Sequence, residues 1–327
     1  MHRPGNDVPT VSIVVPMYNE GENVVEFVRQ LTEMMATLGE SSELILVDDG
    51  SQDDTWERIS AAVQDHANVR GISFSRNFGH QNGLLCGMQW AAGECIVTMD
   101  GDLQHPPSLV PELIRRWRAG AKVVNTRREY PEDIGVLKRL TSYGFYRVFS
   151  WLSGIPLNPG SSDFRLLDRQ VFNAISDIRD TDLFLRGVVQ WAGFPVDTVT
   201  FRAGKRYSGT TKFSFGKMLR VASTAVLSFS LVPLRLGLTL GFLTALFAVA
   251  EVVYVIVVYL QDRTVPGWAS VTVLVAFLFA ILFVVLGIIG AYLGSVFEIL
   301  KNRPRFIVHR QAGFPAEGQR FPSDPSP

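Results

Sequence analysis

The chain has little cysteine and no excess charge of either sign. Its two cysteines in 327 residues, Cys86 and Cys95, both lie in apolar segments, and no C-x-x-C spacing occurs. This excludes a disulfide framework and argues against a zinc site, so we predict two reduced, buried thiols. The 31 Lys and Arg residues balance 31 Asp and Glu residues. Because no basic field results, nucleic acid is not expected as a partner.

Two common nucleotide-binding signatures are also missing. No G-x-G-x-x-G follows the first predicted strand, which argues against a dinucleotide fold of the dehydrogenase type. No G-x-x-x-x-G-K-[ST] occurs either, which argues against a P-loop NTPase. Any nucleotide must therefore be held by other residues.

Long apolar runs, by contrast, are prominent, and 47% of the residues are apolar. They gather in two segments, Leu236–Leu260 and Ala269 to about Phe297. A helix of about 25 residues is about 37 Å long, and the hydrocarbon core of a bilayer is roughly 30 Å thick. A short polar turn at 261–267 joins the segments. We therefore predict a transmembrane hairpin.

The cations around this hairpin predict its orientation. They stand before the first segment and after the second, at Lys212, Lys217, Arg220, Arg235, Lys301, Arg303, Arg305 and Arg310. The connecting turn has one Arg offset by one Asp, and residues 1–7 lack the apolar centre of a secretory signal. Both termini are therefore expected to be cytoplasmic. Two G-x-x-x-G patterns, at 237–241 and 290–294, permit close helix contact within the hairpin or in a homo-oligomer.

The rest of the chain alternates between apolar β-branched runs and amphipathic patterns, which predicts βαβ units around a parallel sheet. Strands are expected at Val11–Val15, Leu44–Val47, Val69–Ser73 and Cys95–Met99, and helices at Glu22 to about Leu38, Asp53 to about Asp65, and Gln81–Ala92. Ser108 is expected to cap the next helix. The segment Gln311–Pro327, rich in Pro, Gly and Ser, is predicted to be disordered.

Polar clusters follow three of these strands. They are P-M-Y-N-E at 16–20, D-D-G-S at 48–51 and D-G-D at 100–102. One strand-end Asp is usually a turn former or a helix cap. The carboxyl ends of parallel strands, however, meet at one edge of the sheet, where ligands of α/β proteins bind. Three clusters together predict a ligand site at that edge.

The motifs resemble those of a known family. They are V-S-I-V-V-P-M-Y-N-E, L-V-D-D-G-S, S-R-N-F-G-H, M-D-G-D-L-Q-H-P-P, S-D-F-R-L, K-R-Y-S-G-T-T-K-F and K-N-R-P-R-F-I-V. In this order, and with two C-terminal spans, they look like a GT-A-fold, family 2 polyprenyl-phosphate glycosyltransferase. The likeness covers about residues 9–310 and is greatest to bactoprenol (undecaprenyl-phosphate) glucosyltransferases, with dolichol-phosphate mannose synthases more distant. It implies an α/β fold with a Rossmann-like sheet of the nucleotide-diphospho-sugar transferase type.

The resemblance also implies a nucleotide-sugar site. The residues at the matching positions are Pro16, Tyr18, Asn19, Glu20, Val47, Asp49, Arg76, Asp100, Gly101, Asp102, Arg206 and Lys212. Asp49 is expected to hydrogen-bond the base. Asp102 and Gln104 match the positions of direct ligands to Mg²⁺ or Mn²⁺, and these ions use few carboxylates together with substrate phosphates. Arg206 and Lys212 match the family's basic loop over the donor diphosphate. The alternative is a juxtamembrane segment whose Lys212 and Lys217 contact anionic lipid head groups.

For the acceptor, the resemblance implies phosphate binding by Arg127, Ser162 and Arg165. Asp163 matches the catalytic acid position, to which the family assigns the role of base. An acceptor phosphate monoester has a second pKa of about 6, so it needs little deprotonation near neutral pH, and Asp163 could instead position it. The aromatic, cationic segment 137–152 is predicted to be an interfacial amphipathic helix, because the same chain carries a transmembrane hairpin; a helix packed on the sheet is the alternative.

These expectations define five parts. They are an N-terminal tail at 1–8, a GT-A catalytic domain at 9–212, a juxtamembrane amphipathic helix at 213–235, the hairpin at 236–297 and a cytoplasmic tail at 298–327. The expected protein is a multi-pass enzyme of the inner (plasma) membrane with a cytoplasmic catalytic domain. It would transfer a sugar, with inversion, from a nucleotide sugar to polyprenyl phosphate.

UDP-glucose and undecaprenyl phosphate are the expected substrates, and GDP-mannose or a UDP-aminosugar is the alternative donor. A processive polysaccharide synthase is disfavoured, because Q-x-x-R-W is missing and only two spans are expected. A non-catalytic membrane scaffold is disfavoured as well, because the carboxylates that such a protein could lose, Asp49, Asp100, Asp102 and Asp163, are all present.

Overall fold

The computed structural model describes residues 9–128, 161–176, 178, 185–201, 232–261, 267–301 and 303–314. Within them, eight strands form one mixed sheet in the order β7-β5-β6-β4-β1-β2-β3-β8. The strands are β1 (Val11–Met17), β2 (Ser42–Asp48), β3 (Val69–Phe74), β4 (Cys95–Thr98), β5 (Val123–Arg128), β6 (Ser161–Asp168), β7 (Val196–Phe201) and β8 (Val308–Ala312). Strands β3, β2, β1 and β4 run parallel, as predicted, while β6 and β8 are antiparallel to their neighbours.

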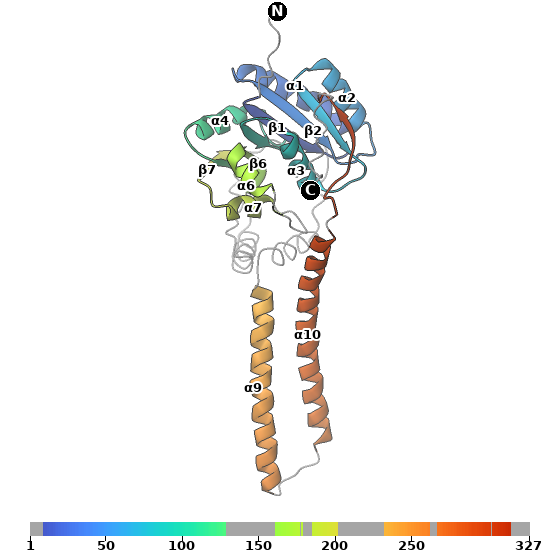
Figure 1. Cartoon of the computed structure of the whole chain (residues 1–327), viewed down its shortest axis with the longest axis vertical. Helices are drawn as coiled ribbons and strands as arrows, with labels where there is room; N and C mark the ends of the chain where they lie inside the picture. Colours follow the sequence, from blue (N-terminus) through green and yellow to red (C-terminus); the bar gives the residue numbers. More distant parts are fainter. Residues whose placement is uncertain are drawn as a thin grey trace, which may run out of the picture.

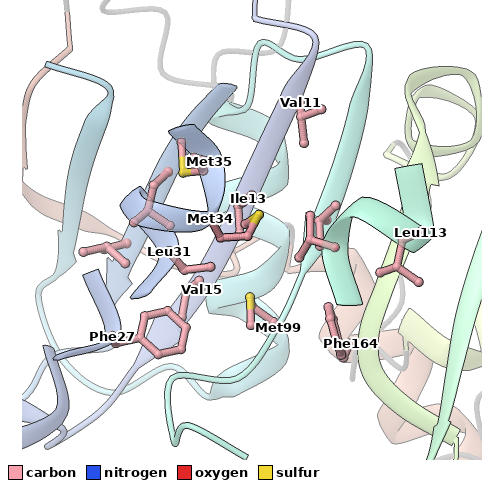
Figure 2. Close-up of a cluster of buried hydrophobic side chains, with 14 of the residues drawn as sticks. Val11, Ile13, Val15, Phe27, Leu31, Met34, Met35, Met99, Leu113 and Phe164 are labelled. Carbon is pink, nitrogen blue, oxygen red and sulfur yellow. The ribbon is translucent and has the colours of Figure 1, made fainter. Parts of the chain in front are cut away.

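Helices cover both faces of this sheet (Figure 1). They are α1 (Gly21–Thr37), α2 (Thr55–Asp65), α3 (His80–Trp90), α4 (Val110–Arg118), α6 (Arg169–Ile175) and α7 (Leu185–Trp191). Alternation along each strand sends successive side chains to opposite faces. Ile13 and Val15 pack with α1 and α4, whereas Val14 packs with α3 and α6. Figure 2 shows the first of these two cores, where Phe27 and Leu31 of α1 meet β1.

One predicted helix start is wrong. Ser108 lies within a short 3-10 turn, Pro107–Leu109, and α4 begins at Val110 without a side-chain cap. Proline suits the start of a helix, because it lacks the N–H that would be unpaired there and its φ is already helical. Pro107 and Pro111 occupy such positions in the turn and in α4, so the serine cap is replaced by proline.

The two apolar segments form the long helices α9 (Val232–Leu260) and α10 (Trp268–Leu300), which run side by side away from the sheet (Figure 1). By length and composition, Leu234–Val258 and Val273–Leu300 are candidate membrane spans. A Cβ on Gly237 would lie 3.8 Å from Val285 of α10, whereas one on Gly241, Gly290 or Gly294 would meet no described atom within 4 Å. Of the predicted G-x-x-x-G positions, Gly237 is therefore the one that faces the partner helix.

The predicted disorder of Gln311–Pro327 is wrong for its first residues. Gln311 and Ala312 belong to β8, which pairs antiparallel with β3. Composition missed this strand because an open sheet edge offers unpaired backbone groups to any extended segment that can reach it. Two aromatic contacts, Phe306 on Phe74 and Phe314 on Trp90, hold the segment there.

Several predictions fall outside the described residues. They concern the amphipathic segment 137–152, most of the predicted juxtamembrane helix, at 213–231, and the cationic positions Arg206 and Lys212. Residues 232–235 of that predicted helix form the start of α9.

Candidate active site

The ends of β1 and β2 are joined by hydrogen bonds between their turns. The last residues of the two strands, Met17 and Asp48, are paired in register. Beyond them the Asn19 N–H donates to Ser51 Oγ (2.9 Å), and Asn19 Oδ1 accepts from the Gln52 N–H (2.8 Å). Asn19 has a φ of 53°, a left-handed conformation that Asn tolerates better than most residues. The predicted polar clusters after β1 and β2 therefore form one continuous edge.

Asp49 fixes the segment Arg76–Gly79, hereafter the 76–79 loop. Its carboxylate accepts from the N–H of Phe78 (2.7 Å) and of Gly79 (2.9 Å). Burial raises the pKa of Asp49, although these two hydrogen bonds oppose the rise. The guanidinium of Arg76 lies 4.1 Å from the centre of the Phe78 ring. Asp49 thus has a defined anchoring role, and its hydrogen bond to a base stays a prediction.

Gly50 allows the 76–79 loop to come this close. Its φ is +68°, and a Cβ built on it would lie 2.3 Å from the carbonyl carbon of Arg76. Both the conformation and the space therefore require glycine.

Of the other residues predicted to bind the nucleotide sugar at the ends of β1 and β2, some are buried and one is exposed. Val47 is fully buried, so it supports the site from behind and does not line it. Pro16 is buried against α3, where a Cβ on Gly83 would lie 2.9 Å from its ring. Tyr18 is 42% exposed, which leaves its ring accessible to a ligand.

The acidic tract after β4 folds into a tight turn. Asp102 accepts from both the backbone N–H (3.1 Å) and the side-chain amide (2.7 Å) of Gln104. Gln104 Oε1 in turn accepts from Arg128 (3.1 Å). A Cβ on Gly101 would lie 3.0 Å from Met17 Cγ, so the tract is held closely against β1. Gln104 therefore orients Asp102, and its own place as a metal ligand stays a prediction.

The residues of this turn fit a divalent cation that also binds substrate phosphates. The buried Oδ1 of Asp100 makes no hydrogen bond among the described residues, although His80 Nε2 lies 3.1 Å away. No group of three or more His, Cys, Asp or Glu side chains in the described ranges is arranged to hold a metal by itself. Mg²⁺ commonly uses one or two carboxylates and takes its other ligands from phosphates and water. Asp100 and Asp102 meet that requirement.

Charged and polar side chains gather around the buried Asp163 on β6. This group, hereafter the Asp163 cluster, consists of Asp163, Arg165, Arg186 and Gln81. Arg186 of α7 binds both carboxylate oxygens (2.8 and 2.7 Å). Arg165 and the amide of Gln81 each donate a further hydrogen bond to Asp163 (3.2 Å). Asp163 is 6% exposed and Arg165 is 4% exposed. The carboxylate predicted from the S-D-F-R motif is thus surrounded by donors.

The charged groups of this cluster change one another's pKa values. Burial alone would raise the pKa of Asp163, but Arg186 and Arg165 hold that pKa far below its usual range. Burial lowers the pKa of Arg165 to about 10, against the attraction of Asp163. Both groups are therefore charged near neutral pH. A carboxylate held in this way is a weak proton acceptor.

His80 connects the Asp163 cluster to the acidic tract. Its Nε2 lies 3.1 Å from Asp100 Oδ1 and 3.9 Å from Asp163 Oδ2. Burial alone would lower the pKa of His80, but the two carboxylates raise it. The tract and the cluster therefore lie next to each other, joined by a histidine that was not among the predicted site residues.

His105 has a structural role. Its Nδ1 accepts from the Asp100 N–H (3.1 Å), so the ring proton is assigned to Nε2, which donates to Ser162 Oγ (2.8 Å). The ring also stacks on Phe164, with 5.0 Å between centroids, and burial lowers its pKa. His105 is thus a neutral spacer between the acidic tract and Ser162.

Of the predicted acceptor residues, the structure brings two to Asp163. Ser162 and Arg165 are its neighbours on β6, and Arg165 also donates to the carbonyl of Ser162. Arg127 is exposed on β5, where it pairs in register with Ser161 of β6 and Thr200 of β7. It therefore lies on the strand next to β6.

Three members of the site were not predicted: His80, Gln81 and Arg186. His80 and Gln81 follow the S-R-N-F-G stretch, so the start of the predicted helix could have drawn attention to them. Arg186 lies 23 positions from Asp163, in an apolar helix without a motif, and no signal in the sequence pointed to it.

Comparisons with known proteins show which proteins this chain is similar to. A family model described as Glycosyl transferase family 2 matches residues 12–176. An uncharacterized glycosyltransferase of Synechocystis is 35% identical over 299 residues, which cover 91% of this chain and 94% of that protein. The bactoprenol glucosyl transferase of Shigella phage SfII is 32% identical over 301 residues, or 92% and 97% of the two chains. The crystal structure of glucosyl-3-phosphoglycerate synthase from Mycobacterium tuberculosis is 21% identical, with a TM-score of 0.47 over 70% of this chain and 86% of that chain.

Proposed function

Because the chain belongs to glycosyl transferase family 2, we propose that it transfers glucose from UDP-glucose to undecaprenyl phosphate at the cytoplasmic face of a membrane. The observation that carries the proposal is the combination, in one chain, of a carboxylate turn beside the Asp163 cluster with two candidate membrane spans. Relatives named bactoprenol glucosyl transferase, such as that of Shigella phage SfII, support the choice of sugar and acceptor.

The donor would lie across the ends of β1, β2 and β4. The exposed ring of Tyr18 and the 76–79 loop would hold the nucleoside, and the acidic tract would face the diphosphate. A Mg²⁺ or Mn²⁺ ion at Asp100 and Asp102 would neutralise charge on the departing diphosphate. The chain's own contribution is to hold Asp102 in one orientation through Gln104 and Arg128.

The acceptor phosphate would approach from the side of the Asp163 cluster. Its oxygen attacks the anomeric carbon in line with the leaving diphosphate, so the configuration inverts. Arg165 and Arg186 offset the repulsion between the two phosphorylated substrates, and Arg127 on the neighbouring strand adds a third cation. Arg206 and Lys212, which lie outside the described residues, stay predicted as further cations for the donor diphosphate.

In this proposal Asp163 is an anchor and not a proton acceptor. Its two oxygens accept hydrogen bonds from Arg186, Arg165 and Gln81, and its pKa is far below the second pKa of a phosphate monoester, about 6. A proton on the acceptor would therefore not move to Asp163. The carboxylate instead holds the two arginines in position, which is an electrostatic task.

The hairpin would anchor the enzyme in the inner (plasma) membrane with both termini cytoplasmic. The described cations at its ends, Arg235, Lys301, Arg303, Arg305 and Arg310, follow the positive-inside pattern. This arrangement would let a lipid acceptor reach the catalytic edge without leaving the bilayer.

The test is a product assay with the full chain in lipid. The enzyme is incubated with undecaprenyl phosphate, Mg²⁺ and one of UDP-glucose, GDP-mannose or a UDP-aminosugar, and the lipid product is identified by mass spectrometry. We expect glucosyl-phosphoryl-undecaprenol from UDP-glucose alone. Transfer from GDP-mannose would correct the donor, and donor cleavage without any lipid product would contradict the proposed acceptor.

A further inference from the structure

The segment after α10 returns to the catalytic domain and pairs with the outer strand of its sheet. In Figure 1 it is the red segment beside the blue strands. Its strand β8 runs antiparallel to β3, from the pair Val308–Phe74 to the pair Ala312–Gly71. The beginning of β8 therefore lies at the carboxyl end of β3. That is the edge of the sheet where the 76–79 loop begins.

The residues just before β8 continue along this loop. The Ser75 N–H donates to the carbonyl of Ile307 (3.0 Å). The ring of Phe306 stacks on Phe74, with centroids 5.0 Å apart and an interplanar angle of 14°. Phe74 is 2% exposed, so this contact belongs to the core beneath the loop.

Phe74 in turn contacts a residue of the 76–79 loop itself. Phe74 meets Phe78 edge to face, with centroids 5.7 Å apart. The backbone N–H of Phe78 is the group held by Asp49 at 2.7 Å. The ring of Phe78 also carries the guanidinium of Arg76. Phe306 is therefore joined through Phe74 to Phe78, Asp49 and Arg76, the residues around the proposed nucleoside site.

We infer that Phe306 is a positioning residue for the nucleotide donor. It acts through Phe74 and Phe78 to hold the 76–79 loop against Asp49, and it makes no contact with substrate. The inference rests on the proposed function, because it takes this loop to bind the donor nucleoside. It also links the donor site to the hairpin, since Phe306 follows the end of α10 at Leu300 by a few residues.

The experiment compares Phe306→Ala with wild type as full chains in lipid nanodiscs. Donor KM, acceptor KM and kcat are measured, and the affinity for UDP and GDP is measured by calorimetry. Loss of one aromatic pair predicts a rise of about threefold to tenfold in donor KM and in the Kd of the nucleoside diphosphate. The kcat and the acceptor KM are expected to stay within about twofold of wild type.

Ile307→Ala is the matched control. Its side chain is 52% exposed, and its backbone carbonyl, which accepts from Ser75, is kept by the substitution. Phe306→Tyr restores a stacking ring and is expected to restore donor KM. Should Phe306→Ala fail to fold, Phe306→Leu decides the question, because it keeps most of the volume and loses the ring contact.

The outcomes separate this inference from the proposed function. A wild-type protein that binds neither UDP nor GDP would contradict the proposed function. A wild-type protein that binds UDP, with a Phe306→Ala or Phe306→Leu variant that binds it equally well, would overturn the positioning role. A loss confined to kcat or to acceptor KM would overturn it too, as would an equal weakening by Ile307→Ala.

Discussion

The candidate site has two sides, the turns after β1, β2 and β4 and the Asp163 cluster, and they are built in different ways. At the ends of β1, β2 and β4, turns are held by local or strand-neighbour hydrogen bonds, such as Asn19 to Ser51 and Gln104 to Asp102. Around Asp163, the charged and polar side chains come from segments far apart in the chain, β6, α3 and α7. A tight turn requires particular residue types at fixed spacings, so the first side can be recognised from sequence motifs. A charge cluster requires only that its side chains meet in space, so the second side has few sequence motifs.

The largest effect should come from Asp102→Asn, on the side built from turns. The substitution removes the negative charge that would hold a cation on the donor diphosphate, so we expect turnover to fall by about 10²- to 10³-fold. Chelation with EDTA should abolish wild-type turnover, and Mg²⁺ or Mn²⁺ should restore it. Both are followed as nucleoside diphosphate release with UDP-glucose and undecaprenyl phosphate.

Glu57→Gln, at an exposed acid on α2, is the control for Asp102→Asn and should behave as wild type. Full turnover of the wild type after exhaustive chelation would show that the reaction needs no metal. Full turnover of Asp102→Asn would show that Asp102 has no role in it.

The next effect concerns the Asp163 cluster. Asp163→Asn takes away the charge that holds Arg186 and leaves the buried Arg165 without its counter-ion, so turnover should fall by about 10²-fold. If Asp163 is an anchor, the ratio of wild-type to variant turnover should be the same at pH 6 and at pH 8.5. UDP affinity should change less than twofold, because the turns that hold the donor are untouched.

A base role would give a different pH dependence. The acceptor phosphate loses its second proton near pH 6, so a base would matter most below that pH and the variant's deficit would deepen as pH falls. That result would restore the proton-acceptor role. Asp197→Asn, whose carboxylate pairs with Arg116 at the surface (2.7 Å), controls for the loss of one negative charge.

The two sides also differ in how well the sequence predicted them. The family and the α/β fold are confirmed, and α1, α2, α3 and β1 to β4 lie within a few residues of their predicted bounds. Apolar periodicity predicts such elements because it reflects burial on one face or both. Arg186 and His80 were not predicted as site residues, because their contacts with Asp163 depend on how α7 and α3 pack on the sheet. Strand β8 was not predicted either, because it is a strand through its pairing with β3 and not through its own composition.

A smaller effect is expected from substitutions at two glycines in turns, where the cost of a left-handed backbone can be separated from the cost of a steric clash. Gly50 and Gly39 have almost the same φ, +68° and +65°, but a Cβ on Gly50 would meet Arg76, whereas one on Gly39 would meet nothing within 4 Å. Gly39→Ala should therefore cost only the left-handed conformation, about 1–2 kcal/mol of folding free energy. Gly50→Ala should cost more and also weaken UDP binding, because it displaces the 76–79 loop. Melting curves and calorimetry would check this, and equal behaviour of the two variants would show that the approach to Arg76 is unimportant.

The smallest effect is expected in the hairpin, which extends away from the sheet that carries the candidate site (Figure 1). Gly237 faces Val285 and Ile288 of α10, whereas Gly241, one turn further along α9, has no described atom near its missing Cβ. Gly237→Leu should separate the two helices and lower the melting temperature in detergent, by an amount that corresponds to about 1–2 kcal/mol. Gly241→Leu should leave the melting temperature unchanged if the protein is a monomer. A larger drop for Gly241→Leu than for Gly237→Leu would mean that this face of α9 packs against a second copy of the chain, since nothing within the described hairpin would explain it.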